Sequence, residues 1–187
     1  MTESDSRRSA LLVMDYQVGV VAAYGAGHPE LLDRAAAVIA SARARAMPVI
    51  YVQVAFRPGH PEIGSHNTRL EAAIKARDLF VADSEMAKIH PSIAPVLGDV
   101  VVTKRRTNAF WGTDLDIILR AQQIDALVLM GIATSGVVLS TVRHAFDADY
   151  DLTVVGDCCI DGDAEVHRVL LEKVIGRQAR LVSAATF

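Results

Sequence analysis

The chain has 187 residues, of which 51% are hydrophobic, and it carries a formal net charge of -3. This length is enough for one α/β domain with a buried core, so we expect a single domain over residues 1–187, with residues 1–8 disordered. The small negative charge, with no basic cluster beyond residues 104–106, argues against nucleic acid or an anionic membrane as partner. A small-molecule partner is expected instead.

Apolar run lengths and cysteine positions predict the compartment. No apolar run approaches the roughly 20 residues of a membrane-spanning helix, and the first eight residues lack the apolar core of a secretory signal. Cys158 and Cys159 are adjacent in the sequence, which disfavours a disulfide between them. We therefore expect a cytoplasmic protein with reduced thiols.

Apolar runs and segments of helical period alternate along the first third of the chain. Residues 10–14 form a continuous apolar run typical of a central parallel strand, which places Asp15 at its carboxyl end. Residues 30–46 carry apolar side chains at helical spacing and end before Pro48. Residues 49–54 are predicted as the second strand.

Residues 55–99, called the rim below, follow the second strand without regular periodicity. They contain several prolines and one helical piece over residues 68–77. Such a long excursion after a strand end is typical of a segment that covers a binding site. Residues 100–103 are predicted as the third strand, so Lys104 is expected at its carboxyl end.

The same alternation continues to the end of the chain, with Thr113 as a candidate helix N-cap. We expect helices over residues 114–123, 136–149 and 163–177, and strands over residues 126–130, 152–155 and 179–184. Strands this apolar need cover on both faces, and right-handed crossovers then make the sheet doubly wound. The predicted fold is a Rossmann-like α/β three-layer αβα sandwich of about six mainly parallel strands.

The strand over residues 126–130 passes through small residues directly into a helix. This Gly131 turn (residues 131–138) reads Gly131-Ile132-Ala133-Thr134-Ser135-Gly136-Val137-Val138. Small residues let the backbone approach a bound group, and the first N–H groups of a helix are free to donate to an oxygen. Ligands bind at such carboxyl edges of parallel sheets, so a site is expected here, although the turn has no cysteine and no serine elbow.

The Gly131 turn resembles the nucleophile turn of the isochorismatase-like hydrolase superfamily, which includes nicotinamidases and N-carbamoylsarcosine amidases. The superfamily typically reads Gly-aliphatic-Ala-Thr-x-x-Cys-Val-x-x-Thr, and its cysteine falls on Val137 in this register. Residues 11–17 and 101–110 resemble its Asp-x-Gln and Lys…Ala-Phe motifs. Because all three motifs occur in order over most of the chain, the match is specific.

The resemblance implies that Asp15 and Lys104 act as the catalytic carboxylate and amine. An acid and an amine buried together keep each other charged, whereas a solvated ion pair at the strand ends is the alternative. Val137 cannot replace the family's cysteine thiolate because it has no nucleophilic atom. A minority of the family, resembling the isochorismatase of phenazine biosynthesis, also has Gly-Val here and hydrolyses a vinyl ether. That reaction needs protonation of carbon and addition of water, and no thiolate.

Further side chains are candidates for substrate binding. Gln17 is expected to orient a substrate or water, and Arg106 to pair with a substrate carboxylate, with solvent exposure as the alternative. Phe110 and Trp111 are expected to form an apolar wall for a planar or cyclic substrate, with ordinary packing as the alternative. The turn supplies a last group of candidates, namely Thr134, Ser135, Gly136 and Val137.

Within the turn, Ser135 is expected to offer its hydroxyl or its backbone N–H to a substrate oxygen. A triad of Ser140, His144 and Asp147 is disfavoured, because three residues on one helix face cannot converge on one substrate atom. The Asp-x-His metal motif of some nicotinamidases is missing after the second strand. The sequence therefore predicts neither a metal nor another cofactor.

Two functional hypotheses remain open. The first is an isochorismatase-family hydrolase for a small planar or cyclic substrate, with Asp15 as general acid or base, Lys104 as its partner and no cysteine nucleophile. The second is a non-catalytic descendant of the family that binds a small molecule. The resemblance also implies a homo-oligomer, either a dimer or a tetramer, and a non-proline cis peptide bond between Ala133 and Thr134.

Overall fold

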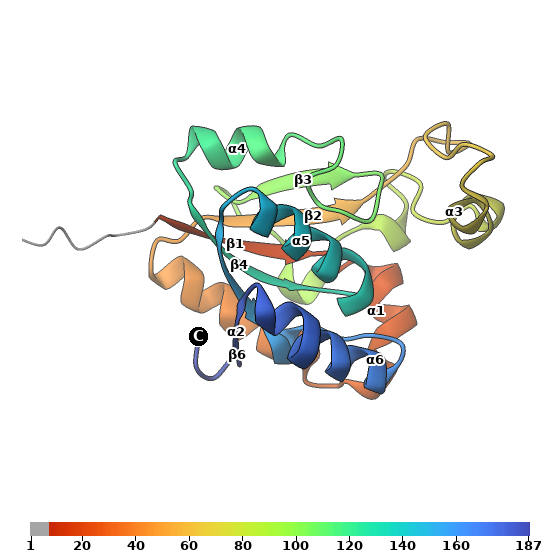
Figure 1. The fold of residues 1–187 in the computed structure, drawn as a ribbon. Coiled ribbons are helices and arrows are strands. Elements are labelled where there is room, and N and C mark those ends of the chain that lie inside the picture. Colours follow the sequence, from red (N-terminus) through yellow and green to blue (C-terminus); the bar gives the residue numbers. More distant parts are fainter. Residues whose placement is uncertain (1–7) are drawn as a thin grey trace, which may run out of the picture.

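A sheet of six parallel strands organises the computed structural model, which describes residues 8–187 (Figure 1). The strand order is β3-β2-β1-β4-β5-β6. The strands are β1 (Ser9–Met14), β2 (Val49–Val54), β3 (Val100–Lys104), β4 (Ala126–Gly131), β5 (Asp151–Val155) and β6 (Arg180–Val182). Each neighbouring pair is parallel, which confirms the predicted α/β class.

The chain winds outward from the centre of the sheet in two directions, because β1 to β3 extend one way and β4 to β6 the other. Right-handed crossovers then place the helices of the two halves on opposite faces, and Figure 1 shows helices on both sides of the sheet. The strand order reverses between β1 and β4, and the crevice outside their carboxyl ends is the expected ligand site of such a sheet.

The helices follow the predicted segments, with one exception. They are α1 (Val18–Tyr24), α2 (Leu31–Ala44), α3 (Thr68–Ala73), α4 (Leu115–Ala121), α5 (Leu139–Asp147) and α6 (Ala164–Val169). Helix α1 was not predicted, because no N-cap side chain marks its start and its valines are poor helix formers. The helices predicted over residues 68–77 and 163–177 are each broken by short 3₁₀ or π-helical turns.

The core lies around β1, whose residues from Ala10 to Met14 are at most 1% exposed. Helix α2 packs on the sheet through buried residues at helical spacing, including Leu31, Ala35 and Val38. The predicted N-cap Thr113 lies one position before the observed cap, Asp114, although its hydroxyl accepts a hydrogen bond from the N–H of Leu115. These packed layers hold the strand ends in fixed register.

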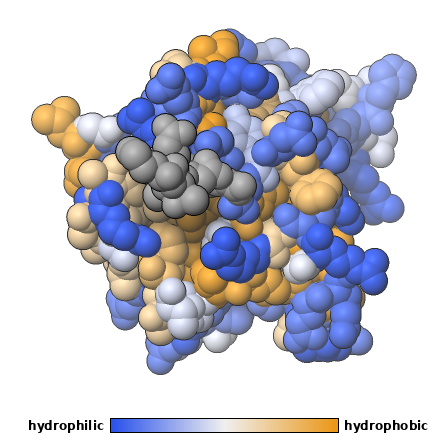
Figure 2. Space-filling model, turned by 60° about the vertical axis from the view of Figure 1, so that its left-hand side comes forward, coloured by the Kyte–Doolittle hydropathy of each residue, from blue (hydrophilic) through white to orange (hydrophobic). Residues whose placement is uncertain are grey.

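The surface around the amino ends of the strands mixes hydrophilic and hydrophobic patches (Figure 2). Within residues 8–187, no helix has both the length and the apolar character needed to cross a membrane. The expected disorder of the N-terminal residues falls mainly on residues 1–7, which lie outside the described part of the chain. The cavity described next opens at the opposite ends of the strands.

Candidate active site

Two strand ends bring a carboxylate and an ammonium group together. Asp15 follows β1 directly and Lys104 ends β3, and the Lys104 Nζ lies 2.9 Å from the Asp15 Oδ2. Lys104 pairs in register with Val54 and therefore crosses the end of β2 to reach Asp15. The expectation that the two residues lie within salt-bridge distance is confirmed, while their role in catalysis stays a prediction.

The carboxylate of Asp15 is buried and only half satisfied. Its Oδ1 has no hydrogen-bond partner among the described residues. Burial raises the pKa of Asp15, and the charge and hydrogen bond of Lys104 oppose this rise without cancelling it. The backbone of Asp15 is left-handed, with a φ of 59°, a region in which aspartate is enriched. This sharp turn places the carboxylate beyond the strand end.

A cavity of about 660 Å³ contains the ion pair in its lining, a volume typical of small-molecule sites. Most of the lining is apolar and comes from α1, the end of β2, the rim and the Gly131 turn. Its large apolar side chains include Tyr24, Phe56, Leu70, Ile74, Leu79, Phe80 and Met86. The rim therefore covers the site, as the sequence predicted.

The Gly131 turn forms another part of this lining. Val137 is 2% exposed and lines the cavity together with Asp15 and Lys104, so methyl groups stand where the superfamily register places a thiol. Gly131 is required because a Cβ there would lie 2.9 Å from the carbonyl oxygen of Met14. The cis peptide bond joins Ile132 and Ala133, so the prediction of Ala133-Thr134 was wrong by one residue.

The loop after β5 and helix α6 hold the turn in place. Both the N–H and the hydroxyl of buried Thr134 donate to the carbonyl of Ile160, at 2.9 and 3.2 Å. The hydroxyl also lies 2.8 Å from the Nδ1 of His167. Thr134 is absent from the cavity lining, so it positions the turn and does not face the ligand space.

Asp161 changes the expected role of Ser135. Its Oδ2 accepts a hydrogen bond of 2.6 Å from the Ser135 N–H. This N–H is therefore occupied and not free for a substrate oxygen, contrary to one of the two expectations. Ser135 still lines the cavity, as does Gly136, which leaves the Ser135 hydroxyl as the candidate donor.

Comparison with known proteins agrees with these motifs and this geometry. The family model "Isochorismatase domain" matches residues 9–186. The chain belongs to the isochorismatase family. The family protein YecD of Escherichia coli O157:H7 is 32% identical over 186 residues, which is 98% of this chain and 96% of YecD. This assignment places the protein in a family of hydrolases.

Two further relatives extend the comparison. The maleamate amidohydrolase of Pseudomonas putida KT2440 is 27% identical over 181 residues, covering 95% of this chain and 84% of the relative. A crystal structure of an isochorismatase family protein from Desulfovibrio vulgaris superposes with a TM-score of 0.85 at 26% identity, covering 97% and 96% of the two chains. The architecture is thus that of the family.

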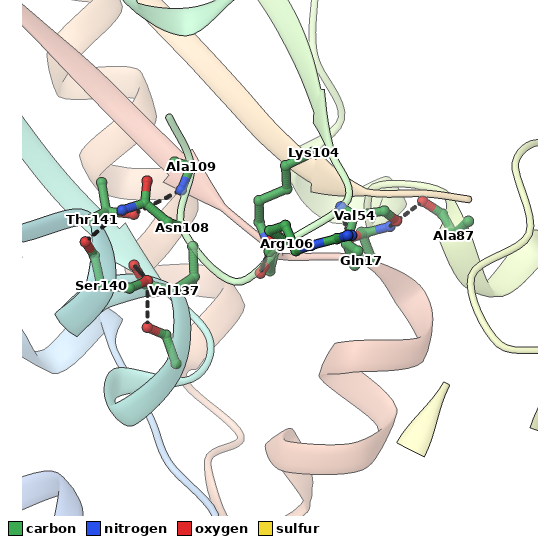
Figure 3. Close-up of polar contacts among 12 residues, drawn as sticks. Gln17, Val54, Ala87, Lys104, Arg106, Asn108, Ala109, Val137, Ser140 and Thr141 are labelled. Atoms are coloured by element: carbon green, nitrogen blue, oxygen red, sulfur yellow. Dashed lines mark hydrogen bonds and ion pairs between the residues drawn. The ribbon is translucent and has the colours of Figure 1, made fainter. Parts of the chain in front are cut away.

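Gln17 of the family-like Asp-x-Gln motif does not face the cavity. Its side chain is fully buried, and its Nε2 donates to the carbonyls of Val54 and Ala87 at 2.8 and 2.6 Å (Figure 3). Its Oε1 accepts from the N–H of Val54 at 2.8 Å. Gln17 therefore fastens the rim to β2, and the expectation that it orients a substrate or water was wrong.

The predicted aromatic wall is also wrong. Phe110 is buried against His144, with ring centroids 4.4 Å apart, and Trp111 is 68% exposed. Neither residue lines the cavity. The side chain of Asn108 donates to Ser140 and the N–H of Ala109 to the Thr141 hydroxyl, so this loop is bound to α5 and carries the two aromatic residues away (Figure 3).

Arg106 lines the cavity and keeps its place among the candidate substrate-binding residues. Its Nη1 donates to the carbonyl of Arg105 at 2.6 Å and its Nη2 to the carbonyl of Glu62 at 2.9 Å. The carbonyl of Arg106 accepts a 3.0 Å hydrogen bond from the Lys104 Nζ. The guanidinium group is thus oriented by backbone carbonyls.

Other reactive groups lie outside the cavity lining. Cys158 and Cys159 are free and buried, and burial raises the pKa of each thiol to about 12. The Ser140 hydroxyl donates to backbone carbonyls, and His144 stacks on Phe110, so neither belongs to a triad. Within residues 8–187, no group of three or more His, Cys, Asp or Glu side chains is arranged to hold a metal.

Proposed function

We propose that the protein is an isochorismatase-family hydrolase that uses Asp15 as general acid and base and Lys104 as its electrostatic partner, without a covalent thiol intermediate. The observation that carries this proposal is the Asp15 Oδ1, which is buried without a hydrogen-bond partner in the described part of the chain while Asp15 lines the cavity. A raised pKa favours the protonated carboxyl group that a general acid needs. The side chain of Val137 has no nucleophilic atom, which supports a mechanism without a covalent thiol intermediate.

Vinyl-ether hydrolysis fits these groups. The Oδ1 proton of Asp15 passes to the terminal alkene carbon, and the ether oxygen donates electrons to give an oxocarbenium ion. Lys104 stabilises the carboxylate that remains. Water then adds to the cationic carbon and returns a proton to Asp15, after which the hemiketal collapses to a ketone and an alcohol. One carboxyl group and one water molecule are therefore sufficient for all of these steps.

The cavity favours a small planar or cyclic substrate. Tyr24, Phe56 and Phe80 supply aromatic surface in place of the predicted Phe110 and Trp111. The hydroxyl of Ser135 and the small residue Gly136 provide a polar edge on the side of the turn. Val137 contacts the substrate as part of the apolar lining. Thr134 positions the turn without lining the cavity.

A panel of cyclic and aromatic vinyl ethers, amides and esters tests the proposal. The wild-type protein should hydrolyse at least one vinyl ether, and Asp15→Asn should reduce its kcat/KM by roughly 10²–10⁴-fold. The matched control is Asp33→Asn, which changes an exposed aspartate on α2. Binding of panel members without turnover of any of them would contradict the proposal and support the non-catalytic alternative.

A further inference from the structure

A segment that follows β5 contacts the Gly131 turn at several residues. This brace (residues 160–167) comprises the loop after the strand and the start of α6. Ile160 forms an isolated parallel bridge with Ile132, and its carbonyl accepts hydrogen bonds from the N–H and the hydroxyl of Thr134. The brace therefore fixes both the path of the turn and the direction of one of its side chains.

The hydroxyl of Thr134 has a single proton and, within the described part of the chain, two hydrogen-bond partners. Its oxygen lies 3.2 Å from the carbonyl oxygen of Ile160 and 2.8 Å from the Nδ1 of His167. A carbonyl oxygen can only accept, so both hydrogen bonds form only when the hydroxyl donates to Ile160 and accepts from Nδ1. A ring proton on Nε2 instead would leave one of these contacts unmade, which is costly because Thr134 is fully buried. The hydroxyl therefore selects the tautomer of His167 with its proton on Nδ1.

The ring of His167 is neutral at neutral pH. Burial lowers its pKa below the usual 6.5, and although Asp161 raises the pKa, His28 lowers it further, so the overall shift is downward. Protonation in acid would add a proton at Nε2 and leave the Nδ1–H in place. The hydrogen bond to Thr134 is therefore available in both charge states of the ring.

The direction of the Thr134 side chain decides which parts of the turn face the cavity. Thr134 does not line the cavity, whereas the next three residues, Ser135, Gly136 and Val137, all do. The π-helical stretch Thr134–Val138 begins at Thr134, no side chain caps its start, and Gly136 has non-helical backbone angles within it. Regular helical hydrogen bonding alone does not fix such a stretch, so its orientation depends on the contacts of Thr134.

We propose that His167 is a positioning residue, which donates its Nδ1–H to the Thr134 hydroxyl and thereby fixes the direction in which Ser135 and Val137 face the cavity. His167 itself does not line the cavity, so it acts through Thr134 and not on a substrate. The orientation of the turn is independent of the proposed chemistry of Asp15, whereas any effect of His167 on turnover rests on that proposed function.

Nitrogen-15 NMR of the full chain with labelled histidine tests the tautomer, because the two ring nitrogens are distinct. At neutral pH, His167 should have a protonated Nδ1 and an unprotonated Nε2. The chain has six histidines, so the signals of His167 are identified by their absence in His167→Asn. A proton on Nε2 of the wild-type ring at neutral pH would overturn the proposal.

Val137→Cys reports the orientation of the turn through the rate at which its thiol reacts with iodoacetamide. In this background, His167→Phe keeps an aromatic ring without a donor and should lower the rate roughly three- to tenfold. His167→Asn carries an amide in place of Nδ1 that can donate to Thr134, so its rate should stay within about twofold of the parent. Equal rates in His167→Phe and the parent, or the same fall in both variants, would overturn the proposal.

Thr134→Val tests the route, since it replaces the hydroxyl by a methyl group of similar size. It should lower the labelling rate by about the same factor as His167→Phe, and combining the two should cause no further fall. Additive falls would show that His167 acts by another route and would overturn the proposal. Glu165→Gln, which changes an exposed residue of the same helix, is the matched control. A fall in this control as large as that in His167→Phe would also overturn the proposal.

Turnover separates this inference from the proposed function. For a hydrolysed vinyl ether, His167→Phe should lower kcat in step with the labelling rate, and His167→Asn should restore both. If turnover survives in Asp15→Asn while the labelling rates follow the expected pattern, the proposed mechanism fails and the positioning role of His167 stands. If Asp15→Asn abolishes turnover while the labelling rates do not respond to His167, the mechanism stands and the positioning role fails.

Discussion

The residue that the motif register aligns with the superfamily cysteine is Val137. It lines the cavity together with Asp15 and Lys104, and it precedes α5. A thiol placed there would lie near a cation and near a helix N-terminus, and both lower a cysteine pKa. The turn therefore keeps an environment suited to a thiolate although it has no sulfur.

Val137→Cys should consequently react with iodoacetamide much faster than an ordinary exposed thiol at neutral pH. The two native cysteines should not react, because Cys158 and Cys159 are buried and burial raises the pKa of each thiol to about 12. Labelling followed by mass spectrometry gives the rate at each cysteine. Reaction at the rate of a free thiol would show that the site no longer has the geometry of the family.

The partner of Asp15 is equally testable. Lys104→Met should destabilise the protein by about 3–5 kcal/mol at neutral pH, because it leaves a buried carboxylate without its cation. Loss of Lys104 also removes an effect that lowers the pKa of Asp15, so this pKa should rise further. The penalty should therefore shrink as pH falls and Asp15 becomes protonated.

Urea unfolding at neutral and acidic pH measures the coupling between Asp15 and Lys104. The proteins compared are Lys104→Met and the double variant Asp15→Asn with Lys104→Met. The double variant should recover part of the loss at neutral pH, and because it has no carboxyl group at residue 15, its stability should not depend on the titration of that group. Equal losses at both pH values would indicate that Asp15 is not ionised against Lys104 in the folded protein.

At this scale the sequence predicted the groups at strand ends and missed the long-range contacts. Asp15 and Lys104 could be placed because parallel strands end at one edge of a sheet. The hydrogen bond from Ser135 to Asp161 could not, since 26 positions separate the two residues and no local pattern marks it.

Among the elements, the junction of β4 with the Gly131 turn is packed so closely that it leaves no room for a side chain on residue 131. Gly131 pairs with Met14, the residue before Asp15. A Cβ on residue 131 would lie 2.9 Å from the Met14 carbonyl oxygen and 3.0 Å from the Met14 Cβ, distances that force the strands apart. The position of Asp15 therefore depends on a glycine in the neighbouring strand.

Gly131→Ala should cost about 1–3 kcal/mol of unfolding free energy and reduce turnover, because the strain falls next to Asp15, the proposed catalytic carboxylate. Denaturant unfolding and steady-state kinetics measure the two effects. Gly27→Ala is the matched control, since a Cβ there would meet no atom within 4 Å. Similar behaviour of the two variants would contradict the close packing at the junction.

The elements themselves were predictable where period and composition agreed. All six strands were predicted to within two residues at each end, because their apolar runs are bounded by polar or small residues. Helix α1 was not predicted because Val18, Val20 and Val21 favour strands in isolation. It forms here because its buried face packs under the rim, where Gly19 lies next to Phe80 and Met86.

For the whole molecule, the assembly state is the open prediction. Trp111 and Ile117 are 68% and 70% exposed, on the loop before α4 and on α4 itself. A contact between copies of the chain would bury these exposed apolar side chains. Because Trp111 does not line the cavity, we expect it instead at a contact between copies of the chain.

We expect a homo-oligomer, either a dimer or a tetramer, by light scattering at micromolar concentration. Ile117→Lys should shift the protein toward the monomer, because it places a charge in the contact. Arg120→Lys keeps the charge of an exposed residue on the same helix and serves as control. A wild-type protein that is monomeric throughout this concentration range would contradict the expectation.

The pH dependence of kcat/KM for the best vinyl-ether substrate tests the central claim most directly. Because Asp15 must be protonated to act as an acid, the rate should fall as pH rises through its pKa, which burial places above the usual 3.8. Asp15→Asn should remove this dependence along with roughly 10²–10⁴-fold of the rate, and iodoacetamide should leave the wild-type rate unchanged. A rate that survives in Asp15→Asn, or that is lost on alkylation, would contradict the account.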